Sequence, residues 1–223
     1  MRRALAGGLV FILSLPLSRL DETFEIDGNV VEGPEFFRYL GSIIQKDGEL
    51  DGDVAHRIKA GWLKWKSVTE FLCDKDMPHR LKEKFYRTAI RPALLYSSEC
   101  WAVKHCHIQK MSVAEMRMLR WMYGHTRKDR LGNEIIREKV EVAPIEDKMM
   151  ENRLRWFGHV RRRPMDAPVR RLKTWGTEKV VRGRGRPKLT WLRVIENGMR
   201  FLGLHEGMVM ERAQWKEMIH VDF

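Results

Sequence analysis

Apolar residues recur at three- and four-residue steps along most of the chain, which is the period of an amphipathic helix. The first such run predicts a helix with Asp53 as its N-cap and with most cationic side chains away from the apolar face. Its buried stripe is predicted to consist of Val54, Ile58, Trp62, Trp65, Val68 and Leu72.

A second helix is predicted to begin at Pro78, because proline is accepted in the first turn of a helix. Leu81, Phe85 and Ala89 would share its apolar face. Proline inside a helix removes a hydrogen bond and clashes with the preceding turn, so Pro92 is expected either to kink this helix or to end it.

Three further helices follow from the same period. One covers about residues 112–123 and stops at Gly124, with an apolar stripe formed by Met111, Ala114, Met118 and Trp121. A short helix is predicted over residues 133–140. Pro144 then starts a longer helix, whose buried edge is predicted to be Met150, Leu154, Phe157 and Val160.

The two ends of the chain carry different patterns. Between residues 23 and 44 apolar and polar residues alternate, and the Asp27-Gly28 pair between two short β-prone runs predicts a hairpin. The run "FFRYLGSII" predicts a further strand, interrupted at Gly41. Two short helices are predicted at the other end, in the stretches "LTWLRVIENGMRFLGL" and "MERAQWKEMIHVDF".

Charge adds a functional expectation to this mainly helical pattern. The 223 residues include 42 Lys and Arg against 30 Asp and Glu, a formal net charge of +12. Between Glu151 and Arg200 there are 15 Lys and Arg against four acids, so a difference of 11 positive charges lies in this one window. Such segregation favours an anionic partner, and we expect it to be nucleic acid rather than a membrane surface.

The cysteines and the N-terminal segment favour different cellular compartments. Cys73, Cys100 and Cys106 are odd in number and irregularly spaced, which is typical of a reducing compartment rather than of a disulfide framework. The segment 1–20 has two arginines followed by an apolar run, as secretory signals do, and this run is too short to span a bilayer. Leu15-Pro16-Leu17 stands where the small residues of a cleavage site belong.

Several chemistries are disfavoured by spacing. Cys100, His105, Cys106 and His107 lie close together, but the second short ligand pair of a structural zinc site is absent. The calcium-loop template fits the stretch "DGELDGD" when its first position is placed on Asp47. Its twelfth position then falls on Ile58, where the template requires a glutamate. The chain has no Walker loop, no GxSxG elbow and no Asp-Asp pair for two-metal chemistry. Four tryptophans lie on or near apolar helical faces, so we expect them to pack in the core, with stacking on nucleic-acid bases as the alternative. They are Trp62, Trp65, Trp121 and Trp156.

Five blocks, taken in order, resemble the C-terminal part of the reverse transcriptase of LINE-type (non-LTR) retrotransposons, particularly those of plants. They are "FFRYLGSIIQKDGELDGDVAHRIKAGWLKWKSVTEFLCDK", "LKEKFYRTAIRPALLYSSECWAVK", "SVAEMRMLRWMYGHTRKDR", "VAPIEDKMMENRLRWFGHVRRRP" and "RGRGRPKLTW". The resemblance runs from about Phe36 to at least Trp191. It implies that "FRYLG" is the last β-element of the polymerase palm and that the following helices form a thumb and an extension that grip the template and primer.

The resemblance also implies what this chain lacks. Nothing in it matches the family's fingers, its endonuclease or the palm aspartates. We therefore expect no cofactor in this chain, since the Mg²⁺ of the family belongs to the missing palm. The segment 1–20 has no counterpart in the family either, and a truncated or rearranged element explains it better than secretion does.

These inferences combine into one fold class and one division of the chain. We expect a mainly α protein in which a helical, thumb-like bundle follows a small β-hairpin that is a palm remnant, with a basic helical tail. The expected parts are a signal-like or unrelated apolar segment (1–20), the β palm remnant (21–47), the thumb-like region (48–125), the basic extension (126–178), an AT-hook-like linker (179–189) and C-terminal helices (190–223).

The predicted function is that of a C-terminal fragment of an RNA-directed DNA polymerase, inactive alone and limited to binding RNA or DNA in the nucleus or cytoplasm. It has no predicted membrane span and no catalytic or metal residues. The alternatives are a stand-alone AT-hook-type DNA-binding protein and, by the secretory route, a secreted helical protein. The predicted nucleic-acid-binding residues are Arg153, Arg155, Arg161, Arg162, Arg163, Arg182, Arg184, Arg186 and Lys188.

Overall fold

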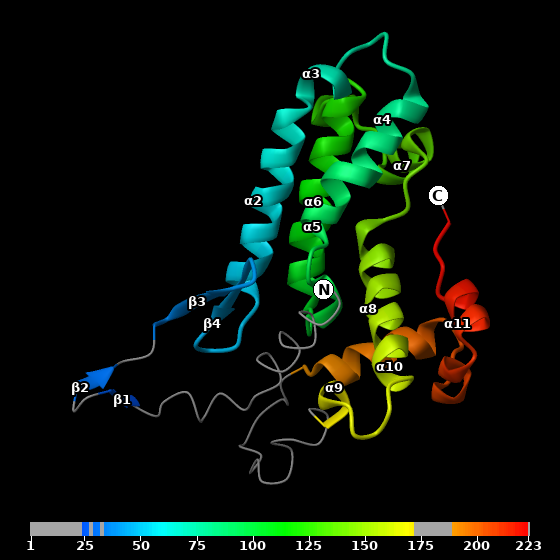
Figure 1. Ribbon diagram of the computed structural model, residues 1–223. Coiled ribbons are helices and arrows are strands. Elements are labelled where there is room, and N and C mark those ends of the chain that lie inside the picture. The colour runs from blue at the N-terminus through cyan, green and yellow to red at the C-terminus, as the bar shows by residue number, and fades with distance from the viewer. Residues whose placement is uncertain (1–23, 27–28, 32–33, 172–188, 223) are drawn as a thin grey trace.

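Helices make up most of the computed structural model, which describes residues 24–26, 29–31, 34–171 and 189–222. Two short antiparallel hairpins precede these helices, and two groups of helices follow, joined by one long helix (Figure 1). The expected mainly α fold with a small β-hairpin at its start is confirmed. No helix within the described residues is both long enough and apolar enough to cross a membrane.

Two hairpins are present where the sequence indicated one hairpin and one interrupted strand. Strand β1 (Phe24–Ile26) pairs with β2 (Asn29–Val31), and the residues between them lie outside the described ones. The predicted interruption is itself a turn, because β3 (Phe36–Tyr39) pairs back on β4 (Ser42–Gln45). Leu40 and Gly41, at the turn, have positive φ values of 49° and 88°, which a two-residue hairpin turn requires.

The first helix, α2 (Asp51–Ser67), has Leu50 as its N-cap and so starts three residues earlier than expected, and α3 (Thr69–Leu72) follows it after a break at Val68. The predicted N-cap role of Asp53 is wrong. This carboxylate is 2% exposed and accepts hydrogen bonds from the backbone N–H of Ile43 and the indole Nε1–H of Trp101, both at 3.0 Å. Asp53 therefore ties strand β4 and the segment before α6 to the first turn of α2.

The predicted second helix is a continuous but distorted one: α4 (His79–Phe85), the π-helix η2 (Tyr86–Ile90) and α5 (Arg91–Leu94). The widened π-turn ends at Ile90, two residues before Pro92, whose missing N–H and bulky ring disturb an ordinary helical turn.

The buried stripe of this second helix differs from the prediction. Leu81 and Phe85 are 44% and 37% exposed, while the neighbouring Lys82, Tyr86 and Ile90 are buried. The stripe is displaced by one residue because Tyr86 is drawn inward by a buried acid described below. Apolar spacing alone gives no sign of that polar contact.

The middle of the chain agrees better with the sequence. Helix α6 (His105–Met122) begins earlier than expected but stops before Gly124, whose φ of 67° suits glycine. After the 3₁₀ turn η4 (Arg127–Asp129), α7 (Asn133–Val140) has the predicted bounds. The predicted position of Trp121 in a buried stripe is wrong, because its side chain is 51% exposed.

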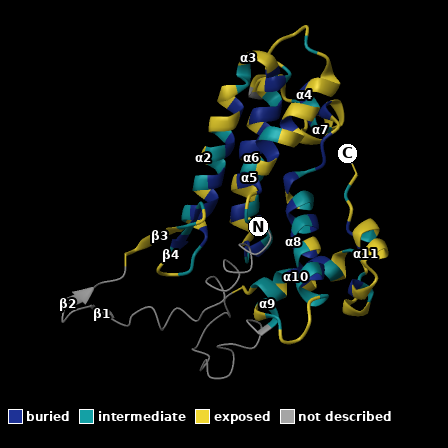
Figure 2. Cartoon of the chain, viewed as in Figure 1, coloured by how far each residue is buried: buried dark blue, intermediate teal, exposed yellow. Residues whose placement is uncertain are grey.

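Helix α8 (Ile145–Arg161) begins after Pro144 as predicted and runs through two hydrophobic cores. Near its start, Ile145 and Met149 belong to the first core, together with residues of α2, α3, η2, α5, α6 and α7. Further along, Leu154 and Phe157 belong to the second core. Figure 2 shows buried residues, in dark blue, along α8.

The short helix α9 (Pro168–Arg171) follows α8. The second core is closed by residues of the later elements: α10 (Trp191–Phe201), the 3₁₀ helix η5 (Glu206–Met210) and α11 (Arg212–Met218). Trp215 of α11 lies so close to Gly158 that a Cβ atom there would be 2.6 Å from the indole Nε1. The same Nε1–H donates to the Leu154 carbonyl at 3.2 Å. Glycine at position 158 thus lets α11 pack directly against α8.

A buried carboxylate, Glu115 of α6, joins the helices of the first group. It is 0% exposed, and it accepts hydrogen bonds from the Tyr86 hydroxyl (2.6 Å) and the Ile145 N–H (3.1 Å). The guanidinium groups of Arg91 and Arg137 lie 3.5 and 3.7 Å from its two oxygens. Burial raises the pKa of Glu115, although both arginines act in the opposite direction.

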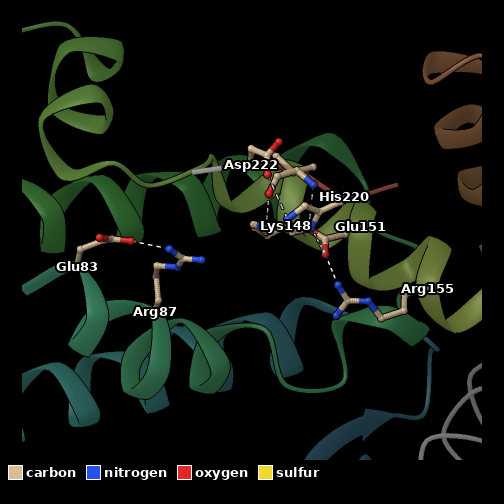
Figure 3. Close-up of polar contacts among 8 residues, drawn as sticks. Glu83, Arg87, Lys148, Glu151, Arg155, His220 and Asp222 are labelled. Carbon is tan, nitrogen blue, oxygen red and sulfur yellow. Dashed lines mark hydrogen bonds and ion pairs between the residues drawn. The ribbon is translucent and has the colours of Figure 1, made fainter. Parts of the chain in front are cut away.

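A second buried carboxylate, Glu151 of α8, anchors the last residues of the described chain (Figure 3). Lys148 donates to it at 2.8 Å, the Val221 N–H donates at 3.3 Å, and Arg155 pairs with its other oxygen. Burial by itself would raise the pKa of Glu151, but Lys148, Arg155 and the Val221 N–H together lower it below its ordinary value. The ionised form is therefore the one that this site stabilises.

We expect Glu115→Gln to lower the free energy of unfolding by about 3 kcal/mol, because it leaves Arg91 buried without a counter-charge. Glu83→Gln is the matched control. It removes the acid of the exposed Glu83–Arg87 pair (2.6 Å), which should matter by less than about 0.5 kcal/mol. Urea denaturation followed by circular dichroism measures both, and equal losses would contradict this assignment.

We expect Glu151→Gln to cost about 2 kcal/mol near neutral pH, and this cost to shrink in acid. The pKa of Glu151 is lower in the folded chain than its ordinary 4.5, so its ionised form stabilises the fold above pH 4.5. That contribution disappears as the pH falls through the folded pKa. Urea titrations at several pH values measure the gap between the variant and the unmodified chain, with the exposed Glu196→Gln as control. A gap that stays constant in acid would refute the role of this charge.

Candidate nucleic-acid interface

The five predicted binding arginines in the long helix and directly after it lie in different environments, although binding requires each of them to be accessible. Arg153 is 5% exposed, so its predicted surface position is wrong. Its Nε and Nη2 atoms have no hydrogen-bond partner among the described residues. Burial lowers the pKa of the Arg153 guanidinium to about 10, without a neighbouring acid that would oppose this shift.

Two of the other arginines form ion pairs within the fold. Arg155 is 55% exposed on its side chain and pairs with Glu151. Arg161 pairs with Glu206 of η5, and its guanidinium carbon lies 5.9 Å from the Phe157 ring centroid. These contacts position the side chains, but each arginine has five N–H donors and retains some for another partner.

Arg162, Arg163 and Arg170 complete a group of cations where α8 ends. Arg162 donates to the Val209 carbonyl at 2.7 Å. Arg170, from α9, donates to the carbonyls of Arg161 and Arg163 at 3.2 and 2.8 Å. Arg163 is exposed, with its guanidinium 3.3 Å from the His159 Nε2. We call this group the arginine cluster, and with the neighbouring α11 residue it comprises Arg161, Arg162, Arg163, Arg170 and Arg212.

The arginine cluster is an electropositive site. Burial, and then the charge of Arg170, lower the pKa of Arg161. Burial, and then the charge of Arg212, lower the pKa of Arg162 in the same way. Burial is the larger cause of both pKa shifts, and the neighbouring like charges add a smaller contribution that an added anion would relieve.

The remaining predicted binding residues are in the AT-hook-like linker. Arg182, Arg184, Arg186 and Lys188 lie outside the described residues, as does most of the linker. In the sequence the linker follows α9 and stands between Arg170 and Arg212 of the arginine cluster.

A second basic surface, on α6, was missed by the sequence analysis. Arg117 and Arg120 line a cleft of about 550 Å³ together with Ser112, Val113, Met116, Leu131 and Asn133. Arg120 donates to the Leu131 carbonyl at 2.7 Å and to the Asn133 side-chain oxygen at 3.0 Å. The sequence contains a pattern that could have revealed this surface. Val113, Arg117 and Trp121 follow one another at four-residue steps, which places them on one face of a helix.

The described residues offer no metal centre, because no three His, Cys, Asp or Glu side chains among them are arranged to hold an ion. The cysteines and histidines singled out by their spacing have other surroundings. Cys100 and His107 are buried, and Cys106 is exposed. His107 lies 3.3 Å from the Asp51 carboxylate and accepts a hydrogen bond from the Lys104 N–H, also at 3.3 Å.

Comparison with known proteins gives one relative. Over 160 residues, 69% of this chain, the sequence is 24% identical to an uncharacterized transposon-derived protein of Caenorhabditis elegans. The chain spans 56% of that relative's length. No family model matches the chain, and no solved structure matches it. The similarity to a transposon-derived protein supports an origin in a transposable element.

Proposed function

We propose that this chain binds the phosphate backbone of nucleic acids, and that it descends from the C-terminal part of a LINE-type reverse transcriptase. The arginine cluster carries this proposal. It gathers five guanidinium groups from the end of α8, the two residues that follow it, α9 and α11, and Glu206 is the acid paired with them among the described residues. A phosphodiester backbone supplies anionic oxygens in the geometry that guanidinium groups bind best.

The contacts inside the cluster support binding rather than competing with it. Arg162 and Arg170 each use donors on backbone carbonyls where α8 ends, which holds their side chains in place. Fixed cations lose less conformational entropy on binding than free ones. Arg163 has no ion-pair partner among the described residues and is the cluster member most available to a phosphate.

The proposed descent rests on the order of the five blocks and agrees with the transposon-derived relative. Because the catalytic aspartates of that family have no match in this sequence, we propose that the chain alone does not extend a primer. Primer extension by the purified chain with Mg²⁺ would contradict this. Extension that requires a separately supplied palm would support descent and indicate action in trans.

We expect binding to RNA or DNA to weaken steeply with salt, because neutralising phosphates releases counterions. Fluorescence anisotropy at a series of salt concentrations gives the slope of log K against log salt, which is close to −0.9 per phosphate contacted on duplex DNA. A slope near zero would refute backbone binding. A clear preference for A·T-rich over G·C-rich duplexes at matched salt would favour the AT-hook alternative instead.

We expect Arg163→Gln to weaken binding to all sequences and to reduce the salt slope by about one. Arg87→Gln, on η2, removes the same charge outside the arginine cluster and should leave the slope unchanged. Arg153→Met removes a buried, unpaired cation. It should leave binding unchanged and raise the free energy of unfolding by about 1 kcal/mol. Equal effects of Arg163→Gln and Arg87→Gln would show that total charge, not the cluster, governs binding.

A further inference from the structure

Three tryptophans meet between α2 and α6, which lie side by side (Figure 1). The ring centroids of Trp62 and Trp65 are 5.7 Å apart, and each lies 5.6 Å from the ring of Trp121. The rings meet edge-on or tilted, an arrangement that aromatic quadrupoles favour. The cluster therefore holds α2 against α6.

Packing accounts for only part of this cluster. Trp65 is 3% exposed and forms its base, but Trp121 is 51% exposed. Trp62 is partly buried between them. Apolar surface is favourable when it is buried, and about half of the Trp121 side chain is not buried. A smaller residue at position 121 would hold the helices together while exposing less apolar surface, so packing alone does not explain this large ring.

Cations surround the exposed aromatic rings. The guanidinium carbon of Arg117 lies 5.8 Å from the Trp62 ring centroid. Lys59 and Lys66 are exposed and stand three residues before and four residues after Trp62, on the same face of α2. None of these three cations forms an ion pair with another described residue, so their charges are available to an anion.

The cleft described above adjoins this surface through Arg117, which takes part in both. Its volume of about 550 Å³ is within the range of small-molecule pockets, and its lining combines apolar side chains with guanidinium groups. Arg120 is held in place by Leu131 and Asn133. The surface and the cleft together offer aromatic faces, apolar walls and fixed positive charge.

We propose that this surface, formed by Lys59, Trp62, Lys66, Arg117 and Trp121, binds single-stranded nucleic acid. The exposed ring of Trp121 stacks on an unpaired base, and the three cations contact the neighbouring phosphates. Single strands fit better than duplexes, because paired bases within a duplex do not offer their faces to a side chain. The inference rests on the proposed function, since it takes the partner to be nucleic acid, and it adds a site and a strand preference.

Aromatic substitutions test stacking separately from packing. Trp121→Leu keeps an apolar side chain but removes the ring, whereas Trp121→Phe keeps a ring. Loss of one base stack should weaken binding of a single strand of about 12 nucleotides roughly tenfold in the leucine variant. The phenylalanine variant should retain most of the affinity. Phe201→Leu, which removes a 79% exposed ring on α10, is the matched control and should bind as the unmodified chain does.

Arg117→Gln is a second variant that leaves the tryptophan packing unchanged. We expect it to weaken single-strand binding and to reduce the salt slope by about 0.7, the value for one phosphate contact on a single strand, while Arg87→Gln does neither. Circular dichroism and urea midpoints identify any variant that fails to fold. If Trp121→Leu does not fold, Arg117→Gln decides the outcome by itself.

The outcomes separate this inference from the proposed function. Salt-dependent binding that is unaffected in both Trp121→Leu and Arg117→Gln would overturn the inference and leave the proposed function standing. Equal losses for single strand and duplex would overturn stacking. Unchanged nucleic-acid binding with an altered sedimentation coefficient would show that the surface contacts a second copy of the chain, which also overturns it. If the unmodified chain binds no nucleic acid, both proposals fail.

Discussion

The buried carboxylate of Glu115 is the contact on which the arrangement of the helices depends. An ion that water does not reach must be satisfied by the protein, and here the partners come from separate stretches of chain: Tyr86 of η2, Arg91 of α5, Arg137 of α7 and the first N–H of α8. The last of these contacts fixes where α8 begins. The position of α8 in turn determines where the arginine cluster stands.

Charge is used in two ways along this fold. Glu115, Asp53 and Glu151 are buried acids whose partners join elements that are distant in sequence. The cluster at the end of α8 is the opposite case, because several cations meet with few acids among them. The first arrangement is complete within the protein. The second is incomplete electrostatically, which is why we infer an anionic partner for it.

Periodicity and turn residues predicted the helical class, the bounds of α7 and the stop at Gly124, because these features depend on local backbone preferences. Tertiary contacts decided the rest. Tyr86 turns inward to reach Glu115, so the stripe of its helix is displaced by one residue. Asp53 binds a strand and an indole rather than capping its own helix. Arg153 and Trp121 exchange the positions that hydropathy predicts for them, the cation buried and the ring exposed. The linker arginines lie outside the described residues, so that part of the predicted site stays a prediction.

The path of α8 through both cores has a thermodynamic consequence. Neither core can lose this helix without exposing apolar surface of the other, so the two should unfold as one cooperative unit rather than independently. A ligand that binds only the folded form raises the stability of such a unit as a whole. An anion held at the end of α8 would therefore also protect the backbone amides of the first core from hydrogen exchange, although it touches none of them.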